Sequence, residues 1–141
     1  MSFRIHATCV SIGGRGVLLR GPSGSGKSDL ALRLIDRGAS LVSDDTTIVE
    51  RTGHTAPLLR PVEKFEGVIE VRGLGPCRVR HAAAAPLSLI CRLGSRPARL
   101  PAPHYRRFGR ETVREACVDA QLPSAPILIE MLLNGAALPL D

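Results

Sequence analysis

The alternation of hydrophobic and polar positions predicts a chain built mostly of short strands, with one clear amphipathic helix near the N-terminus. Residues 3–12 alternate and carry β-branched residues, as a strand does, and residues 13–16 predict a tight turn into a second strand over 17–20. Residues 28–37 predict a helix that ends at Gly38. Its apolar positions share one face: Leu30, Ala31, Leu34 and Ile35.

The rest of the chain reads as further strands and a C-terminal helix. Strands are expected over 39–43, 46–51, 68–72, 77–81 and 86–93, and an irregular or edge segment bounded by prolines over 56–61. Residues 63–66 are charged and expected to be exposed, and residues 111–121 are weakly patterned. Ser124-Ala125-Pro126 can start a helix over 127–133, with Asn134-Gly135 as its stop, although 127–129 could instead form a last strand.

A phosphate-binding loop lies between the second strand and the first helix. Gly21, Gly26, Lys27 and Ser28 fill the pattern of a glycine, four residues, a second glycine, then Lys and Ser or Thr. Glycines let successive backbone N–H groups point at phosphate oxygens, and the helix N-terminus adds a favourable dipole. A Gly/Ser linker would lack the flanking strand and helix. The predicted nucleotide-binding residues are Gly21, Pro22, Ser23, Gly24, Ser25, Gly26, Lys27 and Ser28.

Composition limits the class of protein. The 141 residues suffice for one domain with its own core, and 44% are hydrophobic with few aromatics, so the core should be aliphatic. No apolar run reaches membrane-spanning length and no signal peptide is recognised, so a cytoplasmic location with no membrane partner is expected. The four cysteines are far apart, which favours reduced, buried thiols over disulfides or a zinc site.

The net charge of +6 weakly favours an acidic partner or a phosphate substrate. Lys27 and Lys64 are the only lysines, and the arginines are spread along the chain without an aromatic platform. A nucleic-acid partner is therefore not expected. Residues 94–110 are rich in proline and arginine, and this basic segment is expected to be a mobile loop that meets a partner or, equally, a plain solvated connection.

Two acidic motifs follow predicted strands. Asp44-Asp45 comes directly after the apolar strand 39–43, where ligands of α/β sheets bind, and paired carboxylates there can hold Mg²⁺ or accept a proton. A polar turn is the alternative. Strand alternation places Glu70 and Arg72 on one face, which suits a metal ligand beside a phosphate clamp or, equally, a cross-strand ion pair. His6, in the first strand, is by itself more typical of a surface residue.

Three separated motifs together resemble the catalytic domain of bacterial HPr kinase/phosphorylase. They are the phosphate loop, Leu41-Val42-Ser43-Asp44-Asp45, and the signature Glu70, Val71, Arg72, Gly73, Leu74 and Gly75. The similarity covers roughly residues 5–94. It implies a single catalytic domain over 1–141, with an α/β fold related to phosphoenolpyruvate carboxykinase: a mixed sheet with few helices. It also implies ATP- and Mg²⁺-dependent phosphorylation of a serine on an HPr-like phosphocarrier.

The resemblance carries roles over to individual residues. His6 matches the family's histidine ahead of the phosphate loop, Lys27 the phosphate-contacting lysine, and Ser28 and Glu70 the metal ligands. Asp45, or else Asp44, matches the aspartate that takes the proton from the target serine. Arg107-Phe108-Gly109 resembles the Arg-Leu-Gly of the family's mobile loop, which makes Arg107 a catalytic candidate.

The chain also departs from the family pattern. It starts almost at the catalytic core, Asp29 replaces a usual glutamate, and residues 122–126 lack the Gly-Arg-Asn stretch tied to dephosphorylation. The kinase half is therefore better supported than the phosphorylase half. The chain looks like the shortened form of the family, whose carrier is expected to be a nitrogen-type phosphotransferase protein. Full-length members are hexamers; assembly of this chain, and pyrophosphate in place of ATP, are left open.

Two other functions fit parts of the pattern. A small-molecule phosphate-loop kinase would use a lid with paired arginines, for which Arg106-Arg107 could serve. A nucleotide-binding regulator would bind ATP without transferring phosphate and would not need its carboxylates.

Overall fold

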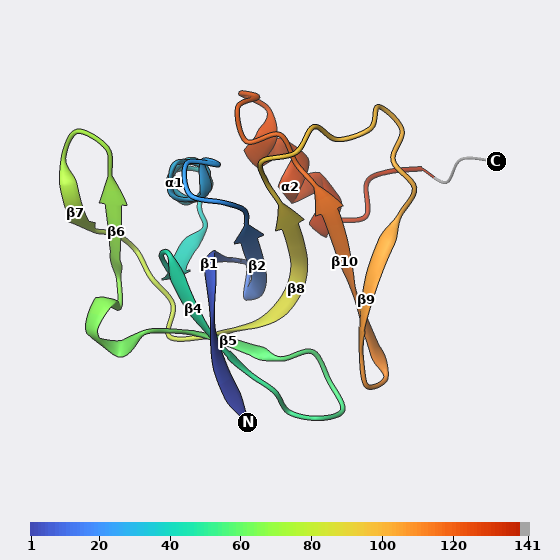
Figure 1. Ribbon diagram of the computed structural model, residues 1–141, viewed down its shortest axis with the longest axis horizontal. Helices are drawn as coiled ribbons and strands as arrows, with labels where there is room; N and C mark the ends of the chain where they lie inside the picture. The colour runs from blue at the N-terminus through green and yellow to red at the C-terminus, as the bar shows by residue number, and fades with distance from the viewer. Residues whose placement is uncertain (139–141) are drawn as a thin grey trace.

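A computed structural model describes residues 1–138 of the chain (Figure 1). The single domain expected over 1–141 stays a prediction, and its residues 139–141 lie outside the described residues. The strands in this part are β1 (Ser2–Ile12), β2 (Arg15–Arg20), β3 (Ser40–Ser43), β4 (Thr46–Glu50), β5 (Leu58–Pro61), β6 (Val68–Val71), β7 (Gly75–Arg78), β8 (Ala85–Arg92), β9 (His104–Phe108) and β10 (Glu111–Cys117). The helices are α1 (Lys27–Asp36) and α2 (Ala125–Leu133), with a 3₁₀ turn η1 (Glu63–Phe65).

Eight strands form one mixed sheet in the order β2-β1-β4-β5-β8-β10-β9, with β3 added beside β1. Because β2 also pairs with β8, the strands β2, β1, β4, β5 and β8 close into a ring. β1 makes this closure possible: residues 2–6 pair with β4, and residues 7–12 pair with β2. β6 and β7 form a separate hairpin at one side of the molecule (Figure 1).

Alternation along the central strands separates two hydrophobic cores. In β2, Val17 and Leu19 face α1, while Leu18 points to the opposite face and packs with Cys9 and Leu59 inside the ring of strands. The predicted apolar face of α1 is fully used, because Leu30, Ala31, Leu34 and Ile35 are all buried in the first core. α2 lies beside α1, and Arg37, the residue after α1, pairs with Glu130 of α2 at 2.7 Å.

The carboxyl ends of four strands meet at one edge of the sheet. β8 runs parallel to both β2 and β10, and β3 runs in the direction of β2 because both are antiparallel to β1. The phosphate loop follows β2, and Asp44-Asp45 follows β3. Figure 1 shows the helices on the side toward which the arrows of β2, β8 and β10 point. This edge is where α/β sheets bind ligands, and it positions the site described below.

The expected turn, first helix and last helix are confirmed. Gly13 and Gly14 have φ of 58° and 82°, the conformation of a type I′ hairpin turn, which favours glycine at both positions. Gly38, with φ of 114°, follows the C-terminus of α1. Residues 125–133 form α2, so the alternative of a last strand over 127–129 is wrong.

Three expectations need correction. Residues 56–61 are not an edge segment, because β5 pairs with β4 on one side and β8 on the other and buries Leu59. The expectation of a loop throughout 94–110 is wrong for residues 104–108, which form β9 and pair with β10. The strand expected over 77–81 begins earlier, at Gly75, and ends at Arg78.

β9 escaped the pattern because its residues are mostly exposed polar ones, so it has no alternation to read. Pairing with β10 holds it at the edge of the sheet, helped by Arg106, whose Nε lies 2.6 Å from Glu115. The weak pattern over 111–121 likewise hid β10. Within residues 1–138, no helix is long and apolar enough to cross a membrane.

The four cysteines, all within the described residues, are free, and their burial differs. Cys9 and Cys91 are fully buried, whereas Cys77 and Cys117 are half-buried, so the expectation of reduced thiols holds but only two are enclosed. Burial raises the pKa of the Cys9 and Cys91 thiols far above its usual value, because the apolar core disfavours the thiolate.

Alkylation should therefore divide the thiols into two classes. With iodoacetamide at pH 8, Cys77 and Cys117 should react in the native protein, while Cys9 and Cys91, which stay protonated at this pH, should react only after unfolding in guanidinium. Peptide mass spectrometry measures this directly. Labelling of Cys9 or Cys91 in the native protein as fast as in guanidinium would contradict this burial.

Candidate active site

The phosphate loop forms a cradle between the end of β2 at Arg20 and the start of α1 at Lys27. Gly24 and Gly26 have φ of 82° and 94°, in the left-handed region that favours glycine. At Gly21 the constraint is steric, because a Cβ would lie 2.6 Å from the Ser25 hydroxyl oxygen and 2.9 Å from the Leu93 carbonyl oxygen. The three glycines are thus required by the shape of the loop itself.

Lys27 lies across this loop. Its Nζ donates hydrogen bonds to the carbonyl oxygens of Gly21 at 2.7 Å and Pro22 at 3.0 Å, and the side chain is largely buried. The ammonium group is therefore held at the phosphate loop, and the phosphate-binding role expected of Lys27 stays a prediction.

Asp44 joins three elements at the back of the site. Its Oδ1 accepts hydrogen bonds from the hydroxyls of Ser28 at 2.7 Å and Thr8 at 3.1 Å. Its Oδ2 accepts a third, from the backbone N–H of Glu70 at 3.1 Å. The carboxylate therefore links α1, β1 and β6, and it fixes the Ser28 hydroxyl where β3 ends.

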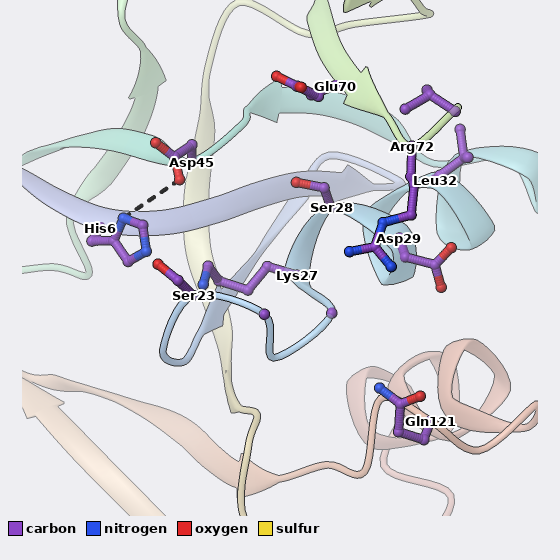
Figure 2. Close-up of a pocket in the computed structure, with 13 residues that line it drawn as sticks. His6, Ser23, Lys27, Ser28, Asp29, Leu32, Asp45, Glu70, Arg72 and Gln121 are labelled. Carbon is purple, nitrogen blue, oxygen red and sulfur yellow. Dashed lines mark ion pairs between the residues drawn. The ribbon is translucent and has the colours of Figure 1, made fainter. Parts of the chain in front are cut away.

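Asp45 differs from its neighbour in backbone and exposure. It has φ of 66°, the only positive value among the non-glycine residues described, and its N–H donates to the Thr8 hydroxyl at 3.1 Å. Its side chain is 72% exposed, and Oδ1 lies 3.5 Å from His6 Nδ1 (Figure 2). A left-handed aspartate costs backbone energy and persists where surrounding bonds hold it, as the Thr8 hydroxyl and the Ala7 N–H do here.

Three signature residues lie across from the phosphate loop: Glu70, Val71 and Arg72. Figure 2 shows Glu70 on the same side as Ser28 and Arg72 reaching toward Asp29 in the first turn of α1. Val71 is half-buried and packs on the first core, while Gly73 and Gly75, with φ of 92° and 88°, turn the chain between β6 and β7. Leu74 lies at the tip of this turn, is 78% exposed and does not line the cavity.

These walls enclose a cavity of about 580 Å³, a volume in the range of small-molecule sites. It brings together ten of the residues expected from sequence: His6, Ser23, Gly24, Gly26, Lys27, Ser28, Asp45, Glu70, Val71 and Arg72. Gly21, Pro22 and Ser25 complete the loop, and Asp44 lines an adjoining hollow with Ser28 and Glu70.

Arg107 is not brought to this cavity. It lies on β9, donates from Nε to the Gly109 carbonyl at 3.1 Å, and lines a separate hollow against the β4–β5 loop. Gly109 packs against His54, and the Arg110 N–H donates to the His54 carbonyl at 3.1 Å, which holds the tip of the β9–β10 hairpin there. The expected role of Arg107 therefore stays a prediction.

Sequence reasoning gave no site role to Asp29, Leu32 and Gln121, which line the cavity, or to Thr8, which contacts the aspartates. Thr8 is fully buried and contacts both aspartates, and its only signal was that it shares a strand face with His6. Gln121 lines the cavity from the loop after β10, and its Nε2 would lie 3.7 Å from a Cβ built on Gly26. The main chain around Gln121 is held by Arg33, which donates to the carbonyls of Ala120 and Leu122.

The donor set suits a hard cation. The Ser28 hydroxyl and the carboxylates of Asp44, Asp45 and Glu70 are oxygen ligands of the kind Mg²⁺ prefers. Over residues 1–138, no group of three or more His, Cys, Asp or Glu side chains is placed to hold a metal ion.

Comparison with known proteins finds relatives of this chain. The family model described as the HPr serine kinase C-terminal domain matches residues 1–137. The HPr kinase/phosphorylase of an Azoarcus species is 34% identical over 96% of this chain and 48% of its own length. That of Lactobacillus acidophilus is 32% identical over 92% of this chain and 42% of its own length. The chain thus spans about half the length of these relatives or less.

Comparison with solved structures points to the same family. The HPr(Ser) kinase/phosphatase from Coxiella burnetii superposes with a TM-score of 0.77 at 26% identity, covering 95% of both chains. The expected mixed α/β fold, with a large mixed sheet and two helices within residues 1–138, is confirmed in this match. The chain belongs to the family of the HPr serine kinase C-terminal domain.

Proposed function

We propose that this chain is an ATP- and Mg²⁺-dependent kinase that phosphorylates a serine on an HPr-like phosphocarrier. The single observation that supports this most is the division of the aspartate pair: Asp44 is bonded to the phosphate-loop Ser28, while Asp45 stands exposed beside His6. On this proposal Asp44 supports the phosphate-loop serine, while the exposed carboxylate of Asp45, which lines the cavity, would meet the acceptor. Relatives named HPr kinase/phosphorylase support the identity of the acceptor.

The nucleotide would be held by the backbone N–H groups of residues 23–28, with Lys27 contacting the β- and γ-phosphates. Ser28 and Glu70, backed by Asp44, would hold Mg²⁺, which when bound neutralises charge on the phosphates. Arg72, whose side chain lines the same cavity, would add a second positive charge near the transferred group.

Asp45 would act as the general base. The serine hydroxyl oxygen attacks the γ-phosphorus as the bond from phosphorus to the β,γ-bridging oxygen breaks; the hydroxyl proton passes to Asp45, and ADP leaves. Asp44 suits this role less, because its carboxylate oxygens already accept three hydrogen bonds. His6, whose Nδ1 lies 3.5 Å from Asp45 Oδ1, would orient that carboxylate and share the proton that it accepts.

Other parts of the expectation have less support. The arginine lid of a small-molecule kinase is not favoured, since Arg106 is engaged by Glu115 and Arg107 lies in a separate hollow. Dephosphorylation of the carrier, use of pyrophosphate, the relation to phosphoenolpyruvate carboxykinase, and assembly into a hexamer stay predictions.

The first test is the reaction itself. Purified protein incubated with HPr, ATP and Mg²⁺ should give phosphoserine-bearing HPr, detected by mass spectrometry, and chelation with EDTA should abolish the product. Unmodified HPr under these conditions, together with consumption of a metabolite in a parallel screen, would overturn the proposal.

Asp45→Asn should lower the turnover of HPr phosphorylation by about 10²- to 10⁴-fold, because the amide cannot take the serine proton. ATP binding, measured by calorimetry, should stay close to that of the unaltered protein. Asp36→Asn is a matched control, since Asp36 is an exposed aspartate at the end of α1. If Asp45→Asn turns over at the normal rate, Asp45 is not the base.

Ser28→Ala should raise the Mg²⁺ concentration needed for half-maximal activity about tenfold or more, because it removes a hydroxyl ligand and one bond to Asp44. Magnesium titration of the HPr phosphorylation rate measures this, with Ser2→Ala, an exposed serine at the start of β1, as control. An unchanged magnesium requirement would remove Ser28 from the metal site.

A further inference from the structure

A second cavity adjoins the active site on the other side of its carboxylates. It has a volume of about 370 Å³ and lies between the start of β4, the turn η1 and the β6–β7 hairpin. Asp45 and Glu70 line both this cavity and the one beside the phosphate loop. None of residues 21–28 lines it, so the nucleotide-binding loop and this cavity face the same two carboxylates from different sides.

The chemistry of the second cavity is unlike that of the first. Three carboxylates line it, those of Asp44, Asp45 and Glu70. The rest of its lining is largely apolar: Val62, Phe65, Val68 and Pro76, with Arg4 and Thr46 at the side of the main sheet. Phe65 is 56% exposed, in a chain that has three phenylalanines in all. An aromatic ring left open to solvent beside catalytic groups is a feature of protein interfaces, where aromatic residues are enriched.

The wall that carries these side chains is tied to the catalytic groups. The Glu70 N–H donates to Asp44, which fixes β6 against the end of β3. η1 precedes β6 directly, and the Phe65 N–H donates to the Val62 carbonyl at 2.9 Å, which shapes the turn that presents the ring. A group bound against Phe65 therefore has a defined position relative to Asp45.

The geometry of phosphoryl transfer indicates which kind of molecule fills the second cavity. In-line transfer requires the attacking oxygen to approach opposite the leaving oxygen. The second cavity gives an acceptor hydroxyl access to Asp45 from a side that no residue of the phosphate loop lines. The face formed by Val62, Phe65, Val68 and Pro76 offers no side-chain hydrogen bond to a sugar or other polar metabolite. A protein segment whose serine is flanked by an apolar side chain can fill it while the hydroxyl reaches Asp45.

We infer that the cavity between β4, η1 and β6 receives an apolar side chain of the phosphocarrier next to the serine that becomes phosphorylated. The inference rests on the proposed kinase function and names the part of the site that recognises the carrier. It makes Phe65 a determinant of carrier affinity with no role in binding ATP.

The test compares Phe65→Ala with the unaltered kinase, using HPr as the carrier. Phe65→Ala should raise the KM for HPr about tenfold, the effect of losing one well-packed interface side chain. The KM for ATP and the kcat at saturating HPr should change less than twofold. Phe65→Leu, which keeps an apolar side chain, should recover most of the affinity. Met131→Ala is the matched control, because Met131 is a 50% exposed apolar residue on α2.

A variant of the carrier supplies a measurement that does not depend on the folding of altered kinase. The phosphorylated serine of HPr is located by mass spectrometry, and each apolar residue flanking it is replaced by Asn. One such replacement should raise the KM with the unaltered kinase but add little with Phe65→Ala, because both remove the same contact.

The outcomes distinguish failure of the proposed function from failure of this inference alone. No phosphorylation of HPr by the unaltered kinase overturns the proposed function and this inference with it. Normal phosphorylation, with a KM for HPr that Phe65→Ala leaves unchanged, overturns only the inference. If Phe65→Ala instead dissociates a dimer in sedimentation experiments without altering the KM for HPr, the cavity is a self-association surface and the inference is wrong.

Discussion

The site depends on the carboxylate of Asp44. Three donors from three parts of the chain converge on it: the Ser28 hydroxyl of α1, the Thr8 hydroxyl of β1 and the Glu70 N–H of β6. Hydrogen bonds to an ionised acceptor are stronger than neutral ones, and Thr8 is fully buried, so loss of this acceptor would leave an unsatisfied donor in the core. The phosphate loop and the signature hairpin are thereby held in one frame.

This frame gives two adjacent aspartates different tasks. Asp44 accepts hydrogen bonds from Ser28, Thr8 and Glu70, whereas Asp45, in a left-handed conformation, projects an exposed carboxylate toward His6. Side chains of adjacent residues in an extended strand point to opposite faces of the sheet. This rule does not apply to Asp44 and Asp45, because the chain turns directly after β3. Strain at Asp45 is consistent with a residue placed for chemistry, since such conformations cluster at functional sites.

The carboxylates also divide the space around them. On one side lies the polar cavity of the phosphate loop, and on the other the apolar cavity bounded by Phe65 and Val68. On the proposed function the two cavities would serve different partners, because a triphosphate needs amides and cations, while a folded partner binds through apolar anchors at its interface. The β6–β7 hairpin contributes to both cavities.

The sequence by itself determined the phosphate loop, α1, the strand before Asp44-Asp45 and the candidate acidic residues, because these features depend on local spacing and on glycine conformations that few other residues adopt. Only the tertiary structure decided what depends on pairing between distant segments: that β5 is an interior strand, that 104–108 pairs with β10, and that Thr8 and Gln121 reach the site while Arg107 does not. A strand such as β9 has no apolar face to reveal it, since its order comes from a partner strand and from Glu115. The split between Asp44 and Asp45 was equally out of reach, because it is set by hydrogen bonds from residues that the chain brings together only on folding.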